Sequence, residues 1–207
     1  MDIVHVVYLV AVLILSIMLH EIAHGVAALK FGDTTAKDAG RLTLNPIPHI
    51  DPIGSIILPL VSIFLGGFII GWAKPVPYNP LRFRNVRLGT FCVAIAGVAT
   101  NLSLAVVAAL CARLLFASGY ANLVPFLALV VMLNLILAIF NLIPIPPFDG
   151  SKIVYSIFNL SYERQQRIEM TIGGFRGFFL IILLFMSGAL SFVFNFAYLA
   201  ASWLLGA

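Results

Sequence analysis

The sequence is divided into long apolar runs joined by shorter stretches that hold nearly all of its charge. The apolar runs are 3–29, 53–72, 90–117, 123–147 and 177–205. A helix needs about 20 predominantly apolar residues to cross the hydrocarbon core of a bilayer, and each run is long enough for that. We therefore expect helices that cross or enter a membrane, because irregular backbone exposed to lipid would leave its polar groups unpaired.

The composition points to the same class of protein. Hydrophobic residues make up 62% of the 207 residues and charged residues only 10%, against about 25% charged residues in a typical soluble domain. The basic residues behind the net charge of +4 are few, which argues against a nucleic-acid partner. Cys92 and Cys111 have neither the number nor the spacing of a disulfide framework. Met1-Asp2 supplies no basic region, so we expect a retained first helix and not a signal peptide.

The positions of the basic residues predict the topology. If 53–72 crossed the membrane, eight basic residues would lie on one side and four on the other. If it entered and returned on the same side, eleven would share that side and only Arg113 would lie opposite. The positive-inside rule favours the second arrangement. Pro59 and the pair Gly66-Gly67 offer break points for such a re-entrant segment.

These patterns predict an all-α polytopic membrane protein with about four transmembrane helices and a re-entrant segment. Full spans are expected at 3–29, 90–117 and 123–147. The run 177–205 is left open as one span or a hairpin, because Gly188 could break it. A small amount of β-structure is allowed in the inner-side loops. We expect residues 1–207 to form a single integral-membrane domain.

The first apolar run ends in a cluster of ionisable residues, His20-Glu21-Ile22-Ala23-His24. Residues four apart share one face of a helix, so both imidazoles can reach one ion. The HExxH arrangement binds zinc and places a glutamate beside it as a general base. Each ionisable group costs about 2.5–3.5 kcal/mol inside a membrane helix on insertion scales, so a chance match is a poor explanation here.

Catalytic zinc needs a third protein ligand, and Asp149 is the best candidate. It closes the apolar run that ends at Phe148, at the predicted inner end of a helix. His20 lies roughly 25 Å along its own helix from Ile3, which also places it near the inner side of a core ~30 Å thick. A glutamate ligand would have to come from Glu163 or Glu169, both in a charged stretch.

Two segments resemble the paired signatures of the site-2 protease family of intramembrane zinc metalloproteases. They are 20–24 (HEIAH) and 141–150 (NLIPIPPFDG), the second with Phe148 where leucine is usual. The stretch 94–101 resembles the family's central-helix pattern, with Val98 where proline is common. The stretch 71–77 is similar to one found in a compact subgroup without PDZ or CBS domains. The resemblance covers about residues 5 to 160.

The resemblance implies a function and a site. His20, His24 and Asp149 match the family's zinc ligands, one zinc ion per chain, and Glu21 matches its general base. The expected reaction is hydrolysis of peptide bonds in membrane-spanning substrate proteins, or regulated intramembrane proteolysis. The family's motif helix and central helix are antiparallel, which also disfavours a full crossing at 53–72.

Other polar residues carry open alternatives. Asn141 could bind the substrate backbone or an oxyanion, or cap the end of its helix. Asn101 and Asn134 are read first as partners in interhelical hydrogen bonds, with a substrate contact as the alternative for Asn101. His49 could bind a second metal or contact substrate, but a role in holding its loop together with Asp51 is favoured.

We expect a multi-pass protein of a prokaryotic plasma membrane, with the site toward the cytoplasmic side. Its expected partners are membrane-protein substrates and the lipid bilayer. The alternative function is a zinc-binding membrane transporter or sensor without hydrolysis. Intramembrane histidines and carboxylates also mark ion pathways. Few polar residues lie in the spans outside 20–24 and 141–149, however, and metal binding alone gives no reason for Glu21.

Overall fold

The computed structural model describes residues 3–57 and 73–206, and within those ranges it contains helices and no strand. The prediction of an all-α protein is therefore confirmed, and the allowance for β-structure finds no counterpart in the part of the chain described. The helices longer than eight residues are α1 (Ile3–Lys30), α4 (Val86–Ala117), α5 (Val124–Asn141), α6 (Asp149–Ile157), α7 (Tyr162–Ile172), α8 (Gly174–Met186) and α9 (Ser191–Leu205). The short elements are α2 (Thr35–Asp38), a π-turn (Pro52–Ile57) and three 3-10 turns (Ile47–His49, Pro80–Arg82, Ala121–Leu123).

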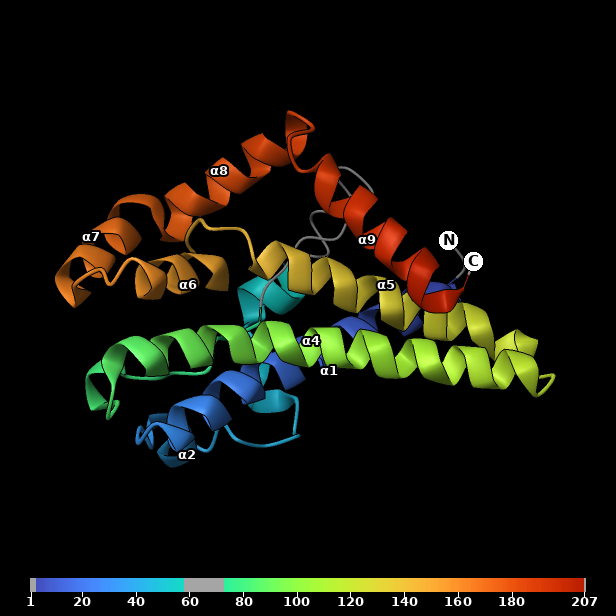
Figure 1. Ribbon diagram of the computed structural model, residues 1–207, viewed down its shortest axis with the longest axis horizontal. Helices are drawn as coiled ribbons and strands as arrows, with labels where there is room; N and C mark the ends of the chain where they lie inside the picture. Colours follow the sequence, from blue (N-terminus) through green and yellow to red (C-terminus); the bar gives the residue numbers. More distant parts are fainter. Residues whose placement is uncertain (1–2, 58–72, 207) are drawn as a thin grey trace.

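Three helices among these residues are long and apolar enough to cross a membrane on their own. They are His5–Lys30, Val86–Ala117 and Ala121–Asn141. Figure 1 shows α1, α4 and α5 running beside one another along the long axis of the molecule, with α9 against α5. The three full spans predicted from the sequence are confirmed as helices.

α4 begins earlier than predicted, and α5 ends before the proline-rich stretch that closes its apolar run. α4 begins at Val86 and not near residue 90, because the Asn85 side chain accepts a hydrogen bond from Leu88 N and caps the helix before the apolar run starts. α5 stops at Asn141 and does not continue to residue 147. Pro144, Pro146 and Pro147 cannot donate the backbone hydrogen bonds that a longer helix would need.

The last apolar run is broken in two. α8 and α9 meet at an angle of 73° across the turn at Gly188, which has φ +75°. A left-handed backbone is easily adopted by glycine, so the sequence position of the break has a simple cause. The pair has the geometry of either a broken span or a re-entrant loop, which are the two alternatives that the sequence leaves open.

The end of α1 and the beginning of α4 lie side by side. Arg84 N donates to Phe31 O over 3.0 Å, and Asn79 N donates to Asp33 Oδ2 over 2.6 Å. The chain between these points therefore leaves and returns at the same end of the helix bundle. The prediction of a re-entrant segment falls mostly on residues 58–72, which lie outside the described ranges.

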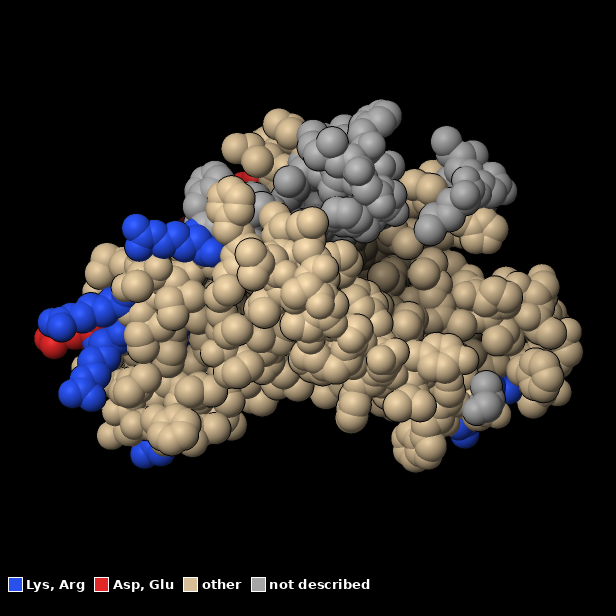
Figure 2. All heavy atoms as spheres, turned by 90° about the horizontal axis from the view of Figure 1, so that it is seen from above, with Lys and Arg blue, Asp and Glu red and all other residues tan. Residues whose placement is uncertain are grey.

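Basic side chains gather at one end of the molecule. Figure 2 shows most Lys and Arg at the end that carries α6 and α7 in Figure 1. Arg113 belongs to the other end, where its Nη2 donates to the carbonyl of Trp203 over 2.8 Å. This asymmetry is the one that the positive-inside rule uses to orient a membrane protein.

Small residues allow the central helices to approach closely. Ala105, Ala108 and Ala109 of α4 pack against Val131 and Leu135 of α5. Ala197 and Ala201 of α9 complete the same buried cluster. Small side chains at such interfaces suit helices in lipid, where dispersion contacts and not the exclusion of water drive association.

Candidate metal centre

Two of the three histidines of the first helix point at each other. His20 and His24 lie one turn apart on α1, and their Nε2 atoms are 2.9 Å apart with the rings at 90°. Both side chains are buried although they belong to a helix with a lipid-facing surface. The i, i+4 spacing of the sequence motif thus places two ring nitrogens at one point.

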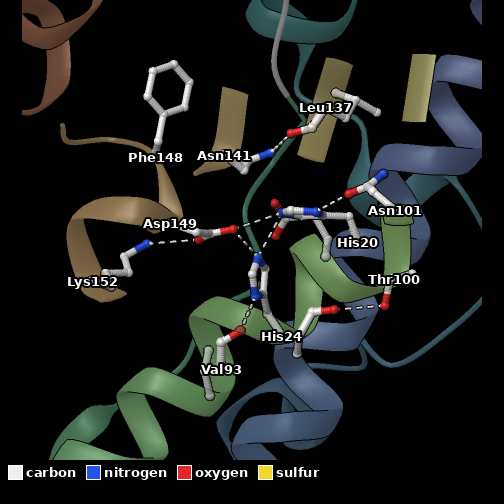
Figure 3. Close-up of polar contacts among 12 residues, drawn as sticks. His20, His24, Val93, Thr100, Asn101, Leu137, Asn141, Phe148, Asp149 and Lys152 are labelled. Carbon is white, nitrogen blue, oxygen red and sulfur yellow. Dashed lines mark hydrogen bonds and ion pairs between the residues drawn. The ribbon is translucent and has the colours of Figure 1, made fainter. Parts of the chain in front are cut away.

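Asp149 reaches the same point from the other side of the bundle. Its Oδ2 lies 3.2 Å from the Nε2 atoms of both His20 and His24 (Figure 3). Asp149 is the first residue of α6, and the proline-rich turn after α5 delivers it there. A Cβ on Gly150 would collide with the carbonyl oxygens of Leu142 and Ile143, so this turn closes tightly only with glycine.

Hydrogen bonds on the far side of each ring fix the tautomers. His24 Nδ1 is 2.7 Å from the carbonyl oxygen of Val93, which can only accept, so Nδ1 carries the proton. His20 Nδ1 is 2.5 Å from Asn101 Oδ1, which also accepts. In the neutral form of each ring, both Nε2 atoms therefore present lone pairs toward the centre and cannot hydrogen-bond to each other.

The chemistry of this donor set fits a cation. Asp149 Oδ2 is buried and has no hydrogen-bond partner, and the two atoms that approach it are ring nitrogens that carry no proton when the imidazoles are neutral. Three converging lone pairs repel one another unless a positive ion lies between them. Ligand atoms at about 2.0–2.1 Å from a tetrahedral zinc ion are roughly 3.3 Å apart, close to the separations seen here. Imidazoles held by a second hydrogen bond are also the usual zinc ligands.

A glycine on α4 makes room for the two rings. A Cβ on Gly97 would lie 2.5 Å from His20 Cε1 and 2.6 Å from His24 Cε1. No side chain larger than hydrogen fits without moving the imidazoles. Gly97, Val93 and Asn101 are spaced by four residues, so one face of α4 supports both histidines.

Glu21 borders the centre without joining the three converging atoms. One of its carboxylate oxygens lies within 4.8 Å of ligand nitrogens of His20 and His24. Its Oε2 accepts a hydrogen bond from Val76 N over 2.7 Å. The side chain is half-buried, whereas the two histidines are buried, so it stands on the more open side of the site.

The partner of Glu21 belongs to an extended segment, 73–79, that is held at several points. Lys74 N donates to His49 O over 2.9 Å, and Lys74 O accepts from Arg41 Nη2 over 2.6 Å. At the other end, Asn79 N donates to Asp33 Oδ2. The Val76 side chain packs near Gly25, one residue past the motif. These contacts place the 73–79 segment along the helix that carries the histidines.

The Lys152 ammonium lies outside the cluster of three converging atoms and offsets the negative charge of the Asp149 carboxylate. Lys152 Nζ lies 3.7 Å from Asp149 Oδ1 and 5.9 Å from the centre of the Tyr78 ring. Burial acts against the charge of Lys152, but its electrostatic interactions with Tyr78 and Asp149 outweigh that effect and raise its pKa. The group is therefore an ammonium at neutral pH and leaves Oδ2 as the oxygen that faces the histidines.

The remaining candidates from the sequence lie elsewhere or have partners. Asn141 ends α5, and its Nδ2 donates to Leu137 O over 3.0 Å, as a residue capping its own helix would. His49 is buried, with Nε2 3.1 Å from Thr43 O. The group of possible metal ligands that lie within 4.8 Å of one another contains His20, Glu21 and His24, and it leaves out both His49 and Asp149, whose Oδ2 is 3.2 Å from the two histidines. Neither Glu163 nor Glu169 belongs to that group.

Several residues at the centre carry no signal that a search for ligands would detect. Val93 and Val76 contribute only backbone atoms, so their side chains give no sign of the role. Gly97 and Lys152 could have been found, Gly97 as a glycine inside a helix and Lys152 as a base one turn after Asp149. Ser16, whose Oγ lies 3.0 Å from Asn134 Nδ2, could also have been found as a polar residue near the centre, since it lies four residues before His20 on the same helix face.

A comparison with models of protein families finds a match. The model described as Peptidase family M50 matches residues 8–185, which include all the residues of the centre. No solved structure matches the chain.

Curated relatives agree with that match. The chain is 40% identical over 193 residues to the "Putative zinc metalloprotease YwhC" of Bacillus subtilis, covering 90% of this chain and 83% of that protein. It is 36% identical over 144 residues to the "Putative zinc metalloprotease Rip2" of Mycobacterium tuberculosis, covering 70% of this chain and 54% of that protein. For Rip2 of Mycolicibacterium smegmatis the identity is 30% over 178 residues, covering 86% of this chain and 66% of that protein.

Proposed function

This chain belongs to peptidase family M50, the site-2 protease family of intramembrane zinc metalloproteases, and we propose that His20, His24 and Asp149 are its zinc ligands and Glu21 its general base. The observation that carries this proposal is the convergence of two imidazole Nε2 atoms and one carboxylate oxygen within 3.2 Å of one another. Two neutral imidazoles and one carboxylate are a typical ligand set for catalytic zinc, which leaves a fourth position open.

Zinc bound there supplies a Lewis acid that polarises the scissile carbonyl and makes water a nucleophile near neutral pH. Glu21 accepts the proton of the attacking water and passes it to the amine that leaves. Val76 N–H holds one oxygen of Glu21, so the other oxygen is directed to the water. The Nδ1 contacts of the two histidines keep their rings in place while this happens.

We propose membrane-spanning proteins as the substrates. The two histidines belong to a helix that is long and apolar enough to cross the bilayer. The carboxylate comes from a helix that begins directly after the turn following another such span. A peptide bond must therefore approach within or at the edge of the hydrocarbon region. A single-span helix unwound at one end is the class of chain that can present it there.

The orientation follows from charge. The end of the bundle that carries the site also carries most of the basic residues, and Arg113 belongs to the other end. By the positive-inside rule that end faces the cytoplasm. We further propose that the chain forms one membrane-embedded domain in a bacterial plasma membrane, as expected from the sequence and from the bacterial relatives.

Membership of a peptidase family favours hydrolysis over the transporter or sensor considered from the sequence. Glu21 can be used to distinguish hydrolysis from transport or sensing, because only hydrolysis needs a general base. The variant Glu21→Gln keeps the shape and removes the base, whereas the three proposed ligands stay intact.

The experiment uses the full chain in lipid nanodiscs with a single-span reporter protein. Glu21→Gln should bind one zinc ion per chain and lose at least about 100-fold in cleavage rate, the usual contribution of a general base. His24→Ala should lose the zinc as well as the cleavage. Unchanged cleavage by Glu21→Gln, or a full complement of zinc in His24→Ala, would refute the assignment.

A further inference from the structure

A chain of buried polar side chains leads away from His20 through three helices. Asn101 of α4 and Asn134 of α5 have no exposed surface, and Ser16 of α1 is almost fully buried. Asn101 Nδ2 donates to Asn134 Oδ1 over 2.9 Å, and Asn134 Nδ2 lies 3.0 Å from Ser16 Oγ. Figure 3 shows the first link of this chain, the Asn101 amide against His20. The prediction that Asn101 and Asn134 make interhelical hydrogen bonds is confirmed, and the structure shows that they bond to each other.

The direction of every bond in the chain follows from one backbone carbonyl. Asn134 Nδ2 lies 2.9 Å from Val130 O, and a carbonyl can only accept, so the nitrogen end of the Asn134 amide is fixed there. Its oxygen must then face Asn101 and accept from Asn101 Nδ2. The Asn101 oxygen is left to face His20, whose Nδ1 must carry the proton. In the neutral ring, Nε2 is therefore the nitrogen without a proton.

Reversing the Asn101 amide would reverse this outcome. An NH₂ group facing His20 would stabilise the other tautomer, with its proton on Nε2 and directed at the metal position. Asn101 could not reverse without leaving two amide nitrogens facing each other at the Asn134 contact. Buried polar groups left without partners cost roughly 1–3 kcal/mol each, which is enough to hold one orientation.

We propose that Asn134 is a positioning residue for the metal, which acts through Asn101 by fixing the amide orientation that keeps His20 Nε2 available as a ligand. The proposal rests on the proposed function, since it takes His20 as a zinc ligand. It assigns a role in metal binding to a residue that touches neither the ion nor a ligand. Removing a hydrogen-bond partner of a ligand weakens metal binding by about 10–100-fold, and for Asn134, one step further away, we expect about 10-fold.

Two variants of equal size separate hydrogen bonding from packing. Asn134→Leu fills the space but neither donates nor accepts. Asn134→Asp has the shape of asparagine, and burial keeps its carboxyl protonated, with one donor for Val130 O and one acceptor for Asn101. Zinc affinity, measured on the full chain in nanodiscs by competition with a chromogenic chelator, should fall about 10-fold in Asn134→Leu and less than about 3-fold in Asn134→Asp.

A second background tests the route through Asn101. In Asn101→Asp the new carboxyl lies against the ring of a proposed zinc ligand, which stabilises its ionised form despite burial. That carboxylate accepts from His20 Nδ1 whichever way it turns, so nothing remains for Asn134 to orient. Asn134→Leu should therefore cost little zinc affinity in the Asn101→Asp protein. Equal losses in the two backgrounds, or unchanged affinity of Asn134→Leu with Asn101 in place, would overturn the proposal.

Controls exclude general destabilisation and failure of the proposed site. Val131→Ala removes buried volume from the next residue of α5, outside the chain of hydrogen bonds, and should lower thermal stability without changing zinc affinity. If Asn134→Leu does not fold, Asn134→Ala replaces it in the same comparison. His20→Ala should lose zinc whatever Asn134 does, so retention of zinc by His20→Ala would contradict the proposed function and not the link to Asn134.

Discussion

The backbone N–H of Val76 donates a hydrogen bond to Glu21 Oε2 over 2.7 Å. Val76 lies between Pro75 and Pro77, which have no N–H of their own. The 73–79 segment thus offers one donor at this point, and the proposed general base receives it. Arg41, His49 and Asp33 hold the segment at its two ends, so the position of this donor is well defined.

The first prediction concerns this contact. Val76→Pro removes the N–H, while the extended backbone that Pro77 imposes on residue 76 is compatible with a proline. We expect kcat to fall about 10-fold with KM changed less than about twofold, because a loosely held Glu21 is a poorer base and not a poorer binding group. Steady-state cleavage of a membrane-embedded reporter measures both constants.

Val76→Ala is the matched control, since it keeps the N–H and removes the side chain that packs near Gly25. It should retain most of kcat. If the alanine variant lost as much kcat as the proline variant, packing of the 73–79 segment would be the cause and not the hydrogen bond.

The second prediction concerns the glycine beneath the two rings. Gly97→Ala places a methyl carbon 2.5 Å from His20 Cε1 and forces both imidazoles to move. We expect zinc affinity to fall at least about 10-fold, as it does when ligand orientation is disturbed. Val98→Ala changes the adjacent residue of α4 and should leave zinc affinity unchanged. Normal zinc binding by Gly97→Ala would contradict the close approach described here.

The sequence predicted the residues of the candidate site better than it predicted the hydrogen bonds that hold those residues in place. The spacing of His20 and His24 and the position of Asp149 after an apolar run are visible in the sequence because they depend on side-chain type. The bonds that orient the histidines come partly from backbone carbonyls, as with Val93. Every residue has such a carbonyl, so only the packing of α1 against α4 selects this one.

The parts of the fold that depend on the length of an apolar run were predictable from the sequence. The helix ends, which depend on caps and prolines, were less so. The spans α1, α4 and α5 follow from the need to fill a bilayer. The early start of α4 depends on the Asn85 cap, and the early stop of α5 depends on prolines. A hydropathy profile takes account of neither the cap nor the prolines. The orientation of α8 and α9 around Gly188 depends on tertiary packing, which a pattern of apolar residues does not encode.

The third prediction uses the buried carboxylate of Asp33. Burial opposes its charge, but hydrogen bonds from the Thr35 hydroxyl and from the amides of Asn79 and Thr35 outweigh that and lower the pKa of Asp33. Its stabilising contribution is therefore present above the unfolded pKa and is lost as the pH falls through the folded one. We expect Asp33→Asn to lower stability by about 2 kcal/mol at pH 7.

The difference in melting temperature between wild type and Asp33→Asn should shrink as the pH is lowered below about 4. Taking the difference between the two melting temperatures at each pH cancels the effect of acid on the candidate metal site, because both proteins contain that site. Asp38→Asn is the control, since the Asp38 carboxylate accepts one exposed hydrogen bond from Thr34. It should change stability little at any pH. A difference for Asp33→Asn that stayed constant into acid would show that the carboxylate charge contributes nothing.

The last prediction concerns removal of the metal. When both rings are neutral and no cation lies between them, the lone pairs of His20, His24 and Asp149 repel one another across about 3 Å in a medium that screens charge poorly. Chelation should therefore lower the melting temperature, and added zinc should restore it, by about 4 kcal/mol of stability at free zinc 1,000-fold above the dissociation constant. His24→Ala should melt at the same temperature with and without zinc. His49→Ala should keep the full zinc-dependent shift, although it removes the contact of the ring Nε2 with Thr43 O, because that contact is directed at its own loop and not at the three converging atoms. A lost shift in His49→Ala would instead make His49 a metal ligand, and an undiminished shift in His24→Ala would place the zinc elsewhere.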